Sequence, residues 1–321
     1  MGKKKSTPIG VVLFLIFVII AAYFLRYRTS KPPGEVFVAG SLQVYMLDVG
    51  QGDSLLIVSP GGKHVLIDAG IPQAGDDVVA ALQKHGVQNI DLAVATHPHS
   101  DHIGGMKRVM DNFPIKNFLD SGQEHPTATY ERMIKAIKDK RINFIEAKKG
   151  MNFDLDSGAK LEVLNPMGNG HWITDVRTGG SVENANSVVL RLSYGDFAMI
   201  FTGDAEAETE AEMIRAGENL RAQVLKVGHH GARYATSDDF LRAVQPQAAV
   251  ISDGADNKYG HPTQETLNRL RRDKVEVYRT DLNGEIAIVS DGKNFQVKPA
   301  RTSDLAAIWQ GRQPVKSEGE R

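Results

Sequence analysis

Residues 91–105 read DLAVATHPHSDHIGG, an apolar run followed by three histidines and an aspartate within the six positions 97–102. The run from Asp91 to Thr96 is typical of a buried β-strand, and residues 101–112 have the periodicity of a helix. Histidine and carboxylate side chains are the usual protein ligands of zinc and similar divalent ions. This strand–loop–helix unit therefore predicts a metal site at the carboxyl end of a strand, where ligand sites are common.

The spacing within the loop divides its ligands between two ions. In an extended loop, His97 and His99 point the same way and can share one ion, whereas Asp101 and His102 lie where the chain turns into the helix and can reach a second. The chain has no cysteine, so nitrogen and oxygen atoms must hold any metal. A polar loop that only faces solvent is the alternative, but so many histidines at one bend favour metal binding.

Alternating strand and helix patterns extend on both sides of this unit. Three short strands separated by glycine-rich turns, at residues 43–49, 53–58 and 64–70, predict an antiparallel meander. Later in the chain, strands and hairpins are predicted at residues 187–204, 223–231, 248–252, 275–280 and 285–298. Helices are predicted at residues 76–85, 205–216, 237–244 and 263–272. Sheets in both halves with helices outside them indicate an α/β fold, a four-layer αββα sandwich.

Polar residues at the ends of other predicted strands are candidates for the same site. Asp204, in FTGD, could bridge two ions, or could cap the following helix instead. His229 and His230 follow a strand in KVGHHG, and one of the two is expected to be a ligand. Asp68, in LIDAG, could hold a ligand histidine by a hydrogen bond, with a turn-forming role as the alternative.

In this order, the residues resemble the metallo-β-lactamase fold hydrolases, whose hallmark is H-x-H-x-D-H. Five segments more narrowly resemble the C-terminal hydrolase domain of ComEC-type competence proteins: LDVGQGDSLLI (47–57), ENANSVVLRLSYG (183–195), FTGD (201–204), LKVGHHG (225–231) and YGHP (259–262). Because five separated motifs agree in order over residues 41–298, the resemblance is specific.

The resemblance implies a ligand set for two divalent ions. It places two histidines on the first ion and three residues on the second, with one bridging carboxylate: His97 and His99; Asp101, His102 and His229; and Asp204. A further family histidine has no clear match, and Asn184 stands nearest to its place, with His171 as the alternative. Asp68 and His230 remain as supporting residues or substitute ligands. Zn²⁺ is expected, with Mn²⁺ as the alternative because an amide oxygen is a weak zinc ligand.

The implied activity is that of a metal-dependent hydrolase, a phosphodiesterase or nuclease acting on DNA, with single-stranded DNA as the candidate substrate. A water activated by two ions would attack phosphorus, with Asp101 orienting it. His261 and the start of the helix after it would contact the phosphate. A small phosphodiester such as a choline-phosphate ester, or a β-lactam-type amide, is the alternative substrate. A non-catalytic module that binds DNA or a protein partner is the third hypothesis.

The N-terminal region differs from the rest in composition. An uncharged apolar run from Ile9 to Leu25 follows Lys3–Lys5 and approaches the length of a membrane-spanning helix. We therefore predict a membrane anchor in residues 1–30, a linker in 31–40, the hydrolase domain in 41–298 and a poorly ordered tail in 299–321. Flanking charges favour an extracytoplasmic catalytic domain. A cleaved signal peptide, and hence a secreted protein, is the alternative.

Overall fold

The computed structural model describes residues 40–312 except residues 169, 179 and 256. The predicted anchor in residues 1–30, and the predicted linker in residues 31–40 apart from its last residue, lie outside the described residues. Over the described range, none of the helices combines the length and the apolar character needed to cross a membrane.

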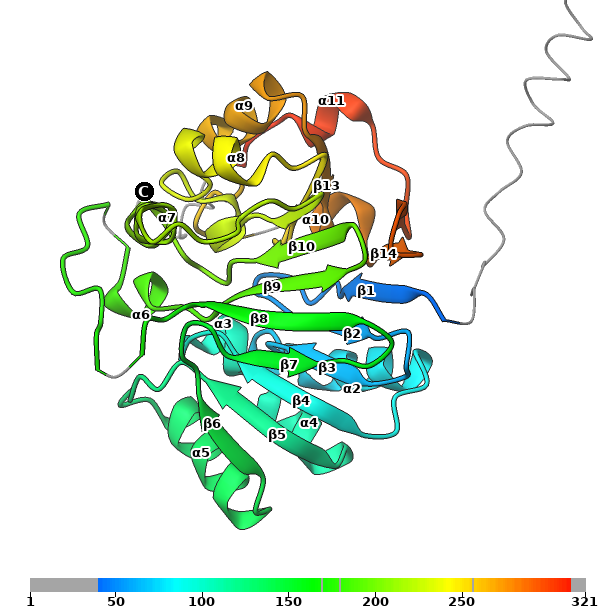
Figure 1. Cartoon of the computed structure of the whole chain (residues 1–321), viewed down its shortest axis with the longest axis vertical. Coiled ribbons are helices and arrows are strands. Elements are labelled where there is room, and N and C mark those ends of the chain that lie inside the picture. The colour runs from blue at the N-terminus through cyan, green and yellow to red at the C-terminus, as the bar shows by residue number, and fades with distance from the viewer. Residues whose placement is uncertain (1–39, 169, 179, 256, 313–321) are drawn as a thin grey trace, which may run out of the picture. The chain divides into compact units, whose positions relative to one another are not determined.

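Two β-sheets face each other across a shared apolar core (Figure 1). In spatial order, the first described sheet contains β15 (Phe295–Pro299), β14 (Ile286–Ser290), β1 (Leu42–Met46), β2 (Leu55–Val58), β3 (His64–Ile67), β4 (Ile90–Ala95), β5 (Ile115–Asp120) and β6 (Asn143–Glu146). The second contains β13 (Glu276–Arg279), β12 (Ala248–Ile251), β11 (Val224–Lys226), β10 (Phe197–Phe201), β9 (Val189–Tyr194), β8 (Ala159–Asn165) and β7 (Asn152–Asp154). The C-terminal hairpin joins the first sheet through antiparallel pairing of β14 with β1.

Helices cover the outer face of each sheet (Figure 1). Against the first sheet lie α2 (Gly75–Lys84), α4 (Met106–Asn112) and α5 (Ala128–Asp139). Against the second lie α7 (Ala207–Arg215), α8 (Asp238–Val244), α9 (Gln264–Arg272) and α11 (Leu305–Ile308). Short turns of helix occupy η1 (Pro72–Ala74), α3 (Ser100–Ile103), α6 (Val182–Ala185), η2 (Gly228–Gly231) and α10 (Thr280–Asn283). The predicted four-layer αββα sandwich is confirmed.

Strand β4 gives the histidine-rich loop a fixed starting point. Leu92 and Val94 face the core between the sheets, whereas Ala93 and Ala95 face the core beneath the helices. A strand buried on both faces reads as a continuous apolar run, as residues 92–95 do. A slip of one residue would exchange the two faces, so packing on both sides fixes the register.

Parallel pairing brings the predicted site residues to the ends of neighbouring strands. β3 pairs with β4 in parallel, and β10, β11 and β12 also run parallel to one another. Asp68 directly follows β3, and His97 lies two positions after β4. In the second sheet, Asp204 follows β10, and the pair His229–His230 follows β11. The prediction that these residues lie at the carboxyl ends of strands is confirmed.

The predicted helix at residues 101–112 is two helices. Gly104 and Gly105 separate α3 from α4. A Cβ atom on Gly105 would lie 2.3 Å from the carbonyl oxygen of Ala69, so the backbone approaches the loop after β3 more closely than a side chain would allow. The predicted meander of β1, β2 and β3, by contrast, is confirmed by antiparallel pairing.

Within the predicted tail at residues 299–321, residues 300–312 pack on the domain, and residues 313–321 lie outside the described residues. Arg279 is fully buried and donates hydrogen bonds to the carbonyl oxygens of Ile308 and Gln310 at 3.2 and 2.8 Å. Arg312 Nε also donates to the carboxylate of Asp281 at 2.9 Å. A buried guanidinium needs hydrogen-bond acceptors, and this segment supplies two of them.

Asp120, at the end of β5, makes the stability of the fold depend on pH. Burial raises the pKa of Asp120 to about 7, against the opposing hydrogen bond from the N–H of Gly122. Between the ordinary pKa of 3.8 and this value, the unfolded chain has released a proton that the folded chain retains. The free energy of unfolding therefore falls as the pH rises through this window.

We expect Asp120→Asn to remove this loss. Its side-chain oxygen can still accept the hydrogen bond from Gly122, and it carries no titrating proton. Urea denaturation should show the variant gaining stability relative to wild type from about pH 4 to about pH 7. The exposed Asp196→Asn is the control, and a pH-independent difference for Asp120→Asn would contradict the prediction.

Candidate metal centre

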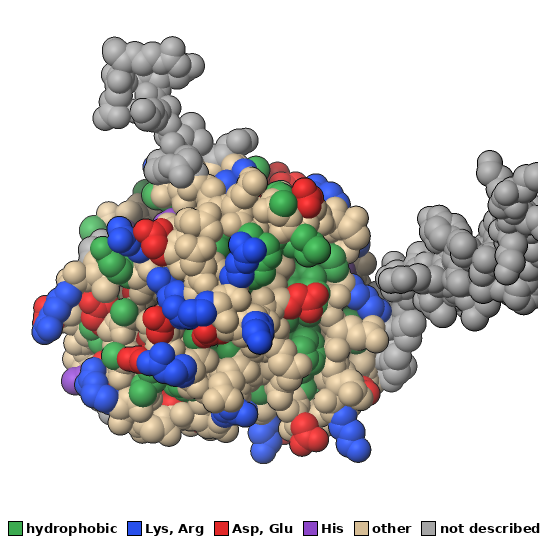
Figure 2. Space-filling model, turned by 90° about the horizontal axis from the view of Figure 1, so that it is seen from above, with side chains coloured by type: hydrophobic (Ala, Val, Ile, Leu, Met, Phe, Trp, Pro, Cys, Tyr) green, Lys and Arg blue, Asp and Glu red, His purple; other side chains and the backbone are tan. Residues whose placement is uncertain are grey.

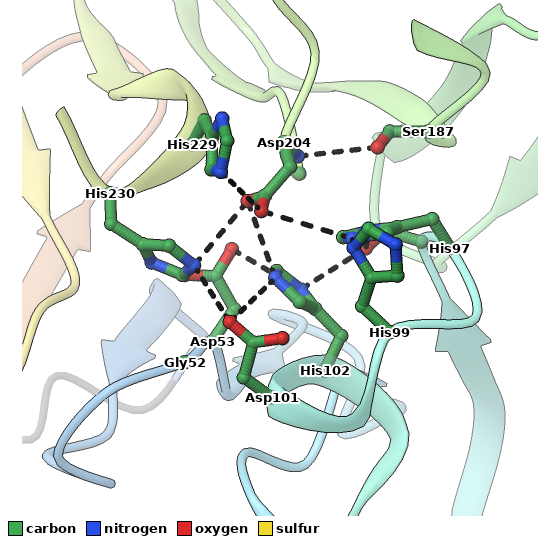
Figure 3. A network of polar contacts seen from close by, with 12 residues as sticks. Gly52, Asp53, His97, His99, Asp101, His102, Ser187, Asp204, His229 and His230 are labelled. Atoms are coloured by element: carbon green, nitrogen blue, oxygen red, sulfur yellow. Dashed lines mark hydrogen bonds and ion pairs between the residues drawn. The ribbon is translucent and has the colours of Figure 1, made fainter. Parts of the chain in front are cut away.

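Four side chains converge at the edge where the two sheets meet (Figure 3). Ligand atoms of Asp101, His102, Asp204 and His230 all lie within 4.8 Å of one another. Asp204 Oδ1 is 3.3 Å from His102 Nε2 and 3.6 Å from His230 Nε2. Asp101 Oδ2 is 3.4 Å from His230 Nε2 and 4.0 Å from His102 Nε2. Tetrahedral ligands 2.0–2.1 Å from a zinc ion are about 3.4 Å apart, so this cluster has the dimensions of a metal site.

Three of these ligand atoms are buried without a hydrogen-bond partner among the described residues: His102 Nε2, Asp204 Oδ1 and His230 Nε2. Leaving such atoms unpaired costs about 1–3 kcal/mol each, so unpaired buried polar atoms in a native fold require an explanation. A divalent cation at the centre of the cluster would satisfy all three. The donor set of two imidazoles and two carboxylates fits zinc or manganese.

The backbone and neighbouring side chains fix the orientation of both histidines. His102 Nδ1 donates to Asp68 Oδ2 at 2.8 Å, and the same carboxylate accepts hydrogen bonds from the backbone N–H and hydroxyl of Thr96. His230 Nδ1 donates to the carbonyl oxygen of Ser252 at 2.8 Å. Both Nε2 atoms are therefore left to face the cluster. Asp68 has the supporting position predicted from the sequence, and this arrangement is common around metal sites.

Two further histidines of the predicted site, His97 and His99, lie on another side of Asp204 (Figure 3). His97 Nε2 is 3.0 Å from His99 Nδ1 and 3.8 Å from Asp204 Oδ2. Burial lowers the pKa of His97 and of His99, and the charge of His102 lowers both further. Neutral imidazole is the form that binds metal ions. His97 and His99 thus lie side by side, and Asp204 lies between His97 and the cluster that contains His102.

The electrostatics of the cluster keep its carboxylates ionised. Burial raises the pKa of Asp101, but His230 Nε2 at 3.4 Å and the charge of His102 hold it well below its usual value. Burial likewise opposes ionisation of Asp204, and the charges of His102 and His230 lower its pKa well below the ordinary value. Ionised carboxylates are the form required for metal binding and for accepting a proton.

The structure corrects the predicted order of the two adjacent histidines. His229 was expected on the ion bound by Asp101 and His102, with His230 as its substitute. His230 instead reaches that cluster, whereas His229 Nε2 lies 3.6 Å from Asp204 Oδ2, on the side of His97. Both histidines have left-handed backbone conformations, with φ of 44° and 52°, so the turn does not follow the alternation of an extended strand.

The remaining predicted residues lie at different distances from the centre. Asn184 is buried, and its Nδ2 is 3.4 Å from both ring nitrogens of His229. The ring of His261 lies 5.3 Å from that of His229 and 6.5 Å from that of His230, centre to centre. His171 is 66% exposed and faces Glu212 at 3.5 Å, so its surroundings are those of a surface residue.

The helix start predicted to hold phosphate beside His261 is covered. Gly311 packs so closely on the first residue of α9 that a Cβ atom there would be 2.7 Å from the backbone nitrogen of Gln264. The N–H of Gly311 also donates to Gln264 Oε1 at 3.0 Å. His261 therefore reaches the site without an accessible helix terminus, because the C-terminal segment occupies that position.

Three buried charged residues beside the centre were absent from the sequence prediction. Lys226 Nζ pairs with the Asp53 carboxylate, and Asp53 Oδ1 is 3.5 Å from His230 Nδ1. Glu206 Oε1 accepts a hydrogen bond from His229 Nδ1 at 2.7 Å. In the sequence, each of these residues shows only as a charge within or beside an apolar strand. Such a charge indicates a buried partner, because buried charges are rarely left unpaired.

The chain belongs to the metallo-β-lactamase superfamily, because residues 47–252 match the model described as "Metallo-beta-lactamase superfamily". This membership and the paired Asp/His clusters define a metal-dependent hydrolase whose fold provides for a dinuclear divalent-metal centre.

Within that class, the resemblance to ComEC-type competence proteins is confirmed. The chain is 31% identical to ComE operon protein 3 of Bacillus subtilis over 292 residues, which are 86% of this chain and 34% of that protein. It is 32% identical to Competence protein ComA of Neisseria gonorrhoeae over 281 residues, or 87% of this chain and 36% of that protein. The chain thus spans about a third of the length of these relatives. Among solved structures, the metallo hydrolase Igni18 of Ignicoccus hospitalis is 15% identical, with a TM-score of 0.48, over 76% of this chain and 98% of that one.

Proposed function

We propose that this protein is a metal-dependent phosphodiesterase that hydrolyses DNA, with single strands as its substrate. The observation that carries the proposal is the cluster of Asp101, His102, Asp204 and His230, whose buried ligand atoms need a cation. Divalent ions held there would supply Lewis acidity and an activated water at neutral pH. The relatives named as competence proteins support DNA as the substrate class.

Two residues of the chain are placed to act on the reacting groups. The Asp101 side chain is 23% exposed, whereas the other three cluster residues are almost fully buried, so Asp101 faces the open side. Its ionised carboxylate accepts a hydrogen bond from the attacking water and orients it. Burial and the charges of His229 and His230 lower the pKa of His261 to about 3. Its neutral imidazole can therefore donate an N–H to a phosphate oxygen.

Two exposed tyrosines, one of them stacked on His261, favour a substrate that has bases. The side chain of Tyr259 is 52% exposed and stacks on His261 with ring centres 5.9 Å apart, and Lys258 Nζ lies 5.1 Å from the centre of the tyrosine ring. Tyr234 is 48% exposed and has the guanidinium of Arg233 5.7 Å from its ring centre. Exposed aromatic rings next to cations are typical of surfaces on which unpaired bases stack.

Charge contributes to DNA binding only locally. The formal net charge of the chain is −1, and Figure 2 shows basic side chains interspersed with acidic ones on one face of the molecule. Long-range attraction of a polyanion requires a continuous basic surface. Binding is therefore expected to depend on stacking and on the metal centre, with a shallow dependence on salt concentration.

The proposal is tested with an end-labelled single-stranded oligonucleotide and with bis(4-nitrophenyl) phosphate, each with added Mn²⁺ or Zn²⁺. Wild type should hydrolyse both, and Asp101→Asn should hydrolyse neither at a comparable rate. Hydrolysis of the reporter alone would favour a small phosphodiester as the substrate. If the protein binds the oligonucleotide but hydrolyses neither compound, the non-catalytic binding module becomes the better interpretation.

Replacing Tyr259 separates base recognition from chemistry. Base–aromatic stacking contributes about 1–3 kcal/mol per base, so Tyr259→Ala should raise KM for the oligonucleotide by about tenfold or more. Its kcat, and both constants for the nitrophenyl reporter, should change little. Tyr259→Phe retains the ring and is the matched control. An equal loss on both substrates would place Tyr259 in the support of His261 rather than in base binding.

A further inference from the structure

A cavity of about 730 Å³, the α5 groove, is lined by the loop of residues 124–126 and by one face of α5. Tyr130, Ile134 and Lys138 follow one another at intervals of four residues along that face, so they lie in a row. The rise from Tyr130 to Lys138 is about 12 Å, at about 1.5 Å per residue. At about 3.4 Å per stacked nucleotide, this length holds about three nucleotides of a single strand.

His125 connects the α5 groove to the metal centre. It lines the groove, and the centre of its ring is 6.0 Å from that of His99. Its Nδ1 is hydrogen-bonded to the Thr127 hydroxyl at 3.1 Å, and that hydroxyl also accepts the N–H of Tyr130 in the first turn of α5. Nε2 is therefore the ring nitrogen that can donate to a phosphate oxygen. The groove thus begins on the side of the centre where His97 and His99 lie.

A row of rings runs from the α5 groove through the metal centre to the exposed Tyr259. Neighbouring ring centres in the row are 4.1 to 6.5 Å apart. Between His125 and Tyr259, the row contains His99, His97, His102, His230 and His261 in that order. Figure 3 shows His99 and His230 on opposite sides of His102. The α5 groove and Tyr259 therefore lie at opposite ends of the row, with the metal centre between them.

The lining of the α5 groove suits an aromatic base with a phosphate beyond it. Tyr130 is partly buried and packs on the core beneath the helix, which holds its ring in place. Bases of any kind stack on such rings. Lys138 is exposed and forms no ion pair with another described residue, so its ammonium group can contact a phosphate. Because Glu124 and Glu131 also line the groove, stacking contributes more to binding than net charge does.

We propose that the α5 groove is a second binding surface for single-stranded DNA, on the opposite side of the metal centre from Tyr259. His125 donates a hydrogen bond to the phosphate nearest the centre, a base stacks on Tyr130, and Lys138 contacts a phosphate farther along the strand. The strand is thus held on both sides of the bond that is cleaved. The inference rests on the proposed function for the identity of its ligand, but its first test measures binding without hydrolysis.

The first test measures the dissociation constant of a fluorescein-labelled oligothymidylate, long enough to extend from Tyr259 to Lys138, for the full-length protein. Fluorescence anisotropy is recorded in EDTA, which prevents hydrolysis. Tyr130→Ala should raise Kd by about fivefold or more, because it removes one stacking surface. Lys138→Met should lower the slope of log Kd against log salt concentration by about 0.7, the value for one lost contact with a single-strand phosphate.

Lys116→Met is the matched control for the lysine variant. Lys116 is an exposed residue at the start of β5, and the site lies beyond the other end of that strand, so the control should bind like wild type. Lys138 lies on the surface, so its variant keeps the test decisive if Tyr130→Ala does not fold. A wild-type Kd for Tyr130→Ala together with a wild-type salt slope for Lys138→Met would overturn the proposal.

The second test compares hydrolysis of the oligothymidylate with that of bis(4-nitrophenyl) phosphate, which is too small to reach Lys138. Lys138→Met should raise KM for the oligonucleotide more than KM for the reporter, with little change in kcat. An equal loss on both substrates would overturn the proposal, because the lysine would then support the fold alone. If wild type binds the oligonucleotide but hydrolyses neither compound, the proposed function fails and the binding measurements still decide on the α5 groove. If wild type hydrolyses both and the variants bind like wild type, only the α5 groove assignment fails.

Discussion

Asp204→Asn is expected to lower kcat/KM for phosphodiester hydrolysis by on the order of 10³-fold or more. Asp204 is the only described side chain with one oxygen facing His102 and His230 and the other facing His97 and His229. An asparagine keeps the volume but removes the negative charge. It also places an amide N–H group against one of the two pairs of histidines. Neither ion would then retain its full ligand set, and each contributes several kcal/mol to catalysis.

The measurement combines steady-state kinetics with metal analysis. Asp204→Asn should contain fewer than two ions per chain, and excess metal should restore activity only in part. Asp196→Asn makes the same chemical change in the exposed turn before β10 and serves as the matched control. Full activity of Asp204→Asn with both ions bound would show that Asp204 does not bridge the two ions.

The four-layer sandwich could be predicted from the sequence where a strand is apolar throughout, as β4 is, or alternates apolar and polar residues at its start, as β1 does. Residues 113–186 carry no predicted element, although β5 to β8 and α5 lie there. β6 and β7 are mostly exposed at the edges of their sheets, so they have little of the apolar pattern that marks a strand. The pairing of β14 with β1 joins segments far apart in the chain, and local patterns cannot indicate it.

The candidate site also has a part that could be predicted from the sequence and a part that could not. The H-x-H-x-D-H loop, Asp204 and Asp68 could be placed from sequence because each follows a recognisable strand. The choice between His229 and His230 depends on two consecutive left-handed residues, a conformation that neither histidine nor its spacing indicates. The contact between Asp53 and Lys226 also escaped prediction, since each residue shows only that a charge lies beside an apolar strand.

Lys226→Met is expected to destabilise the metal-free protein by about 3–5 kcal/mol. Lys226 is fully buried, pairs with the carboxylate of Asp53 and donates to the carbonyl oxygen of Gly203 at 2.8 Å. Methionine fills most of the same space but leaves a buried carboxylate without its cation. Urea denaturation in the presence of a chelator measures this loss directly, because bound ions would otherwise compensate for the missing charge.

The double variant Asp53→Asn/Lys226→Met identifies the cause. If the uncompensated carboxylate is responsible, removing its charge should restore part of the stability, and the double variant should be more stable than Lys226→Met alone. Lys293→Met, at an exposed position, should change the free energy of unfolding by less than about 0.5 kcal/mol. Strictly additive losses would instead mean that Lys226 acts through its hydrogen bond to Gly203 and through packing.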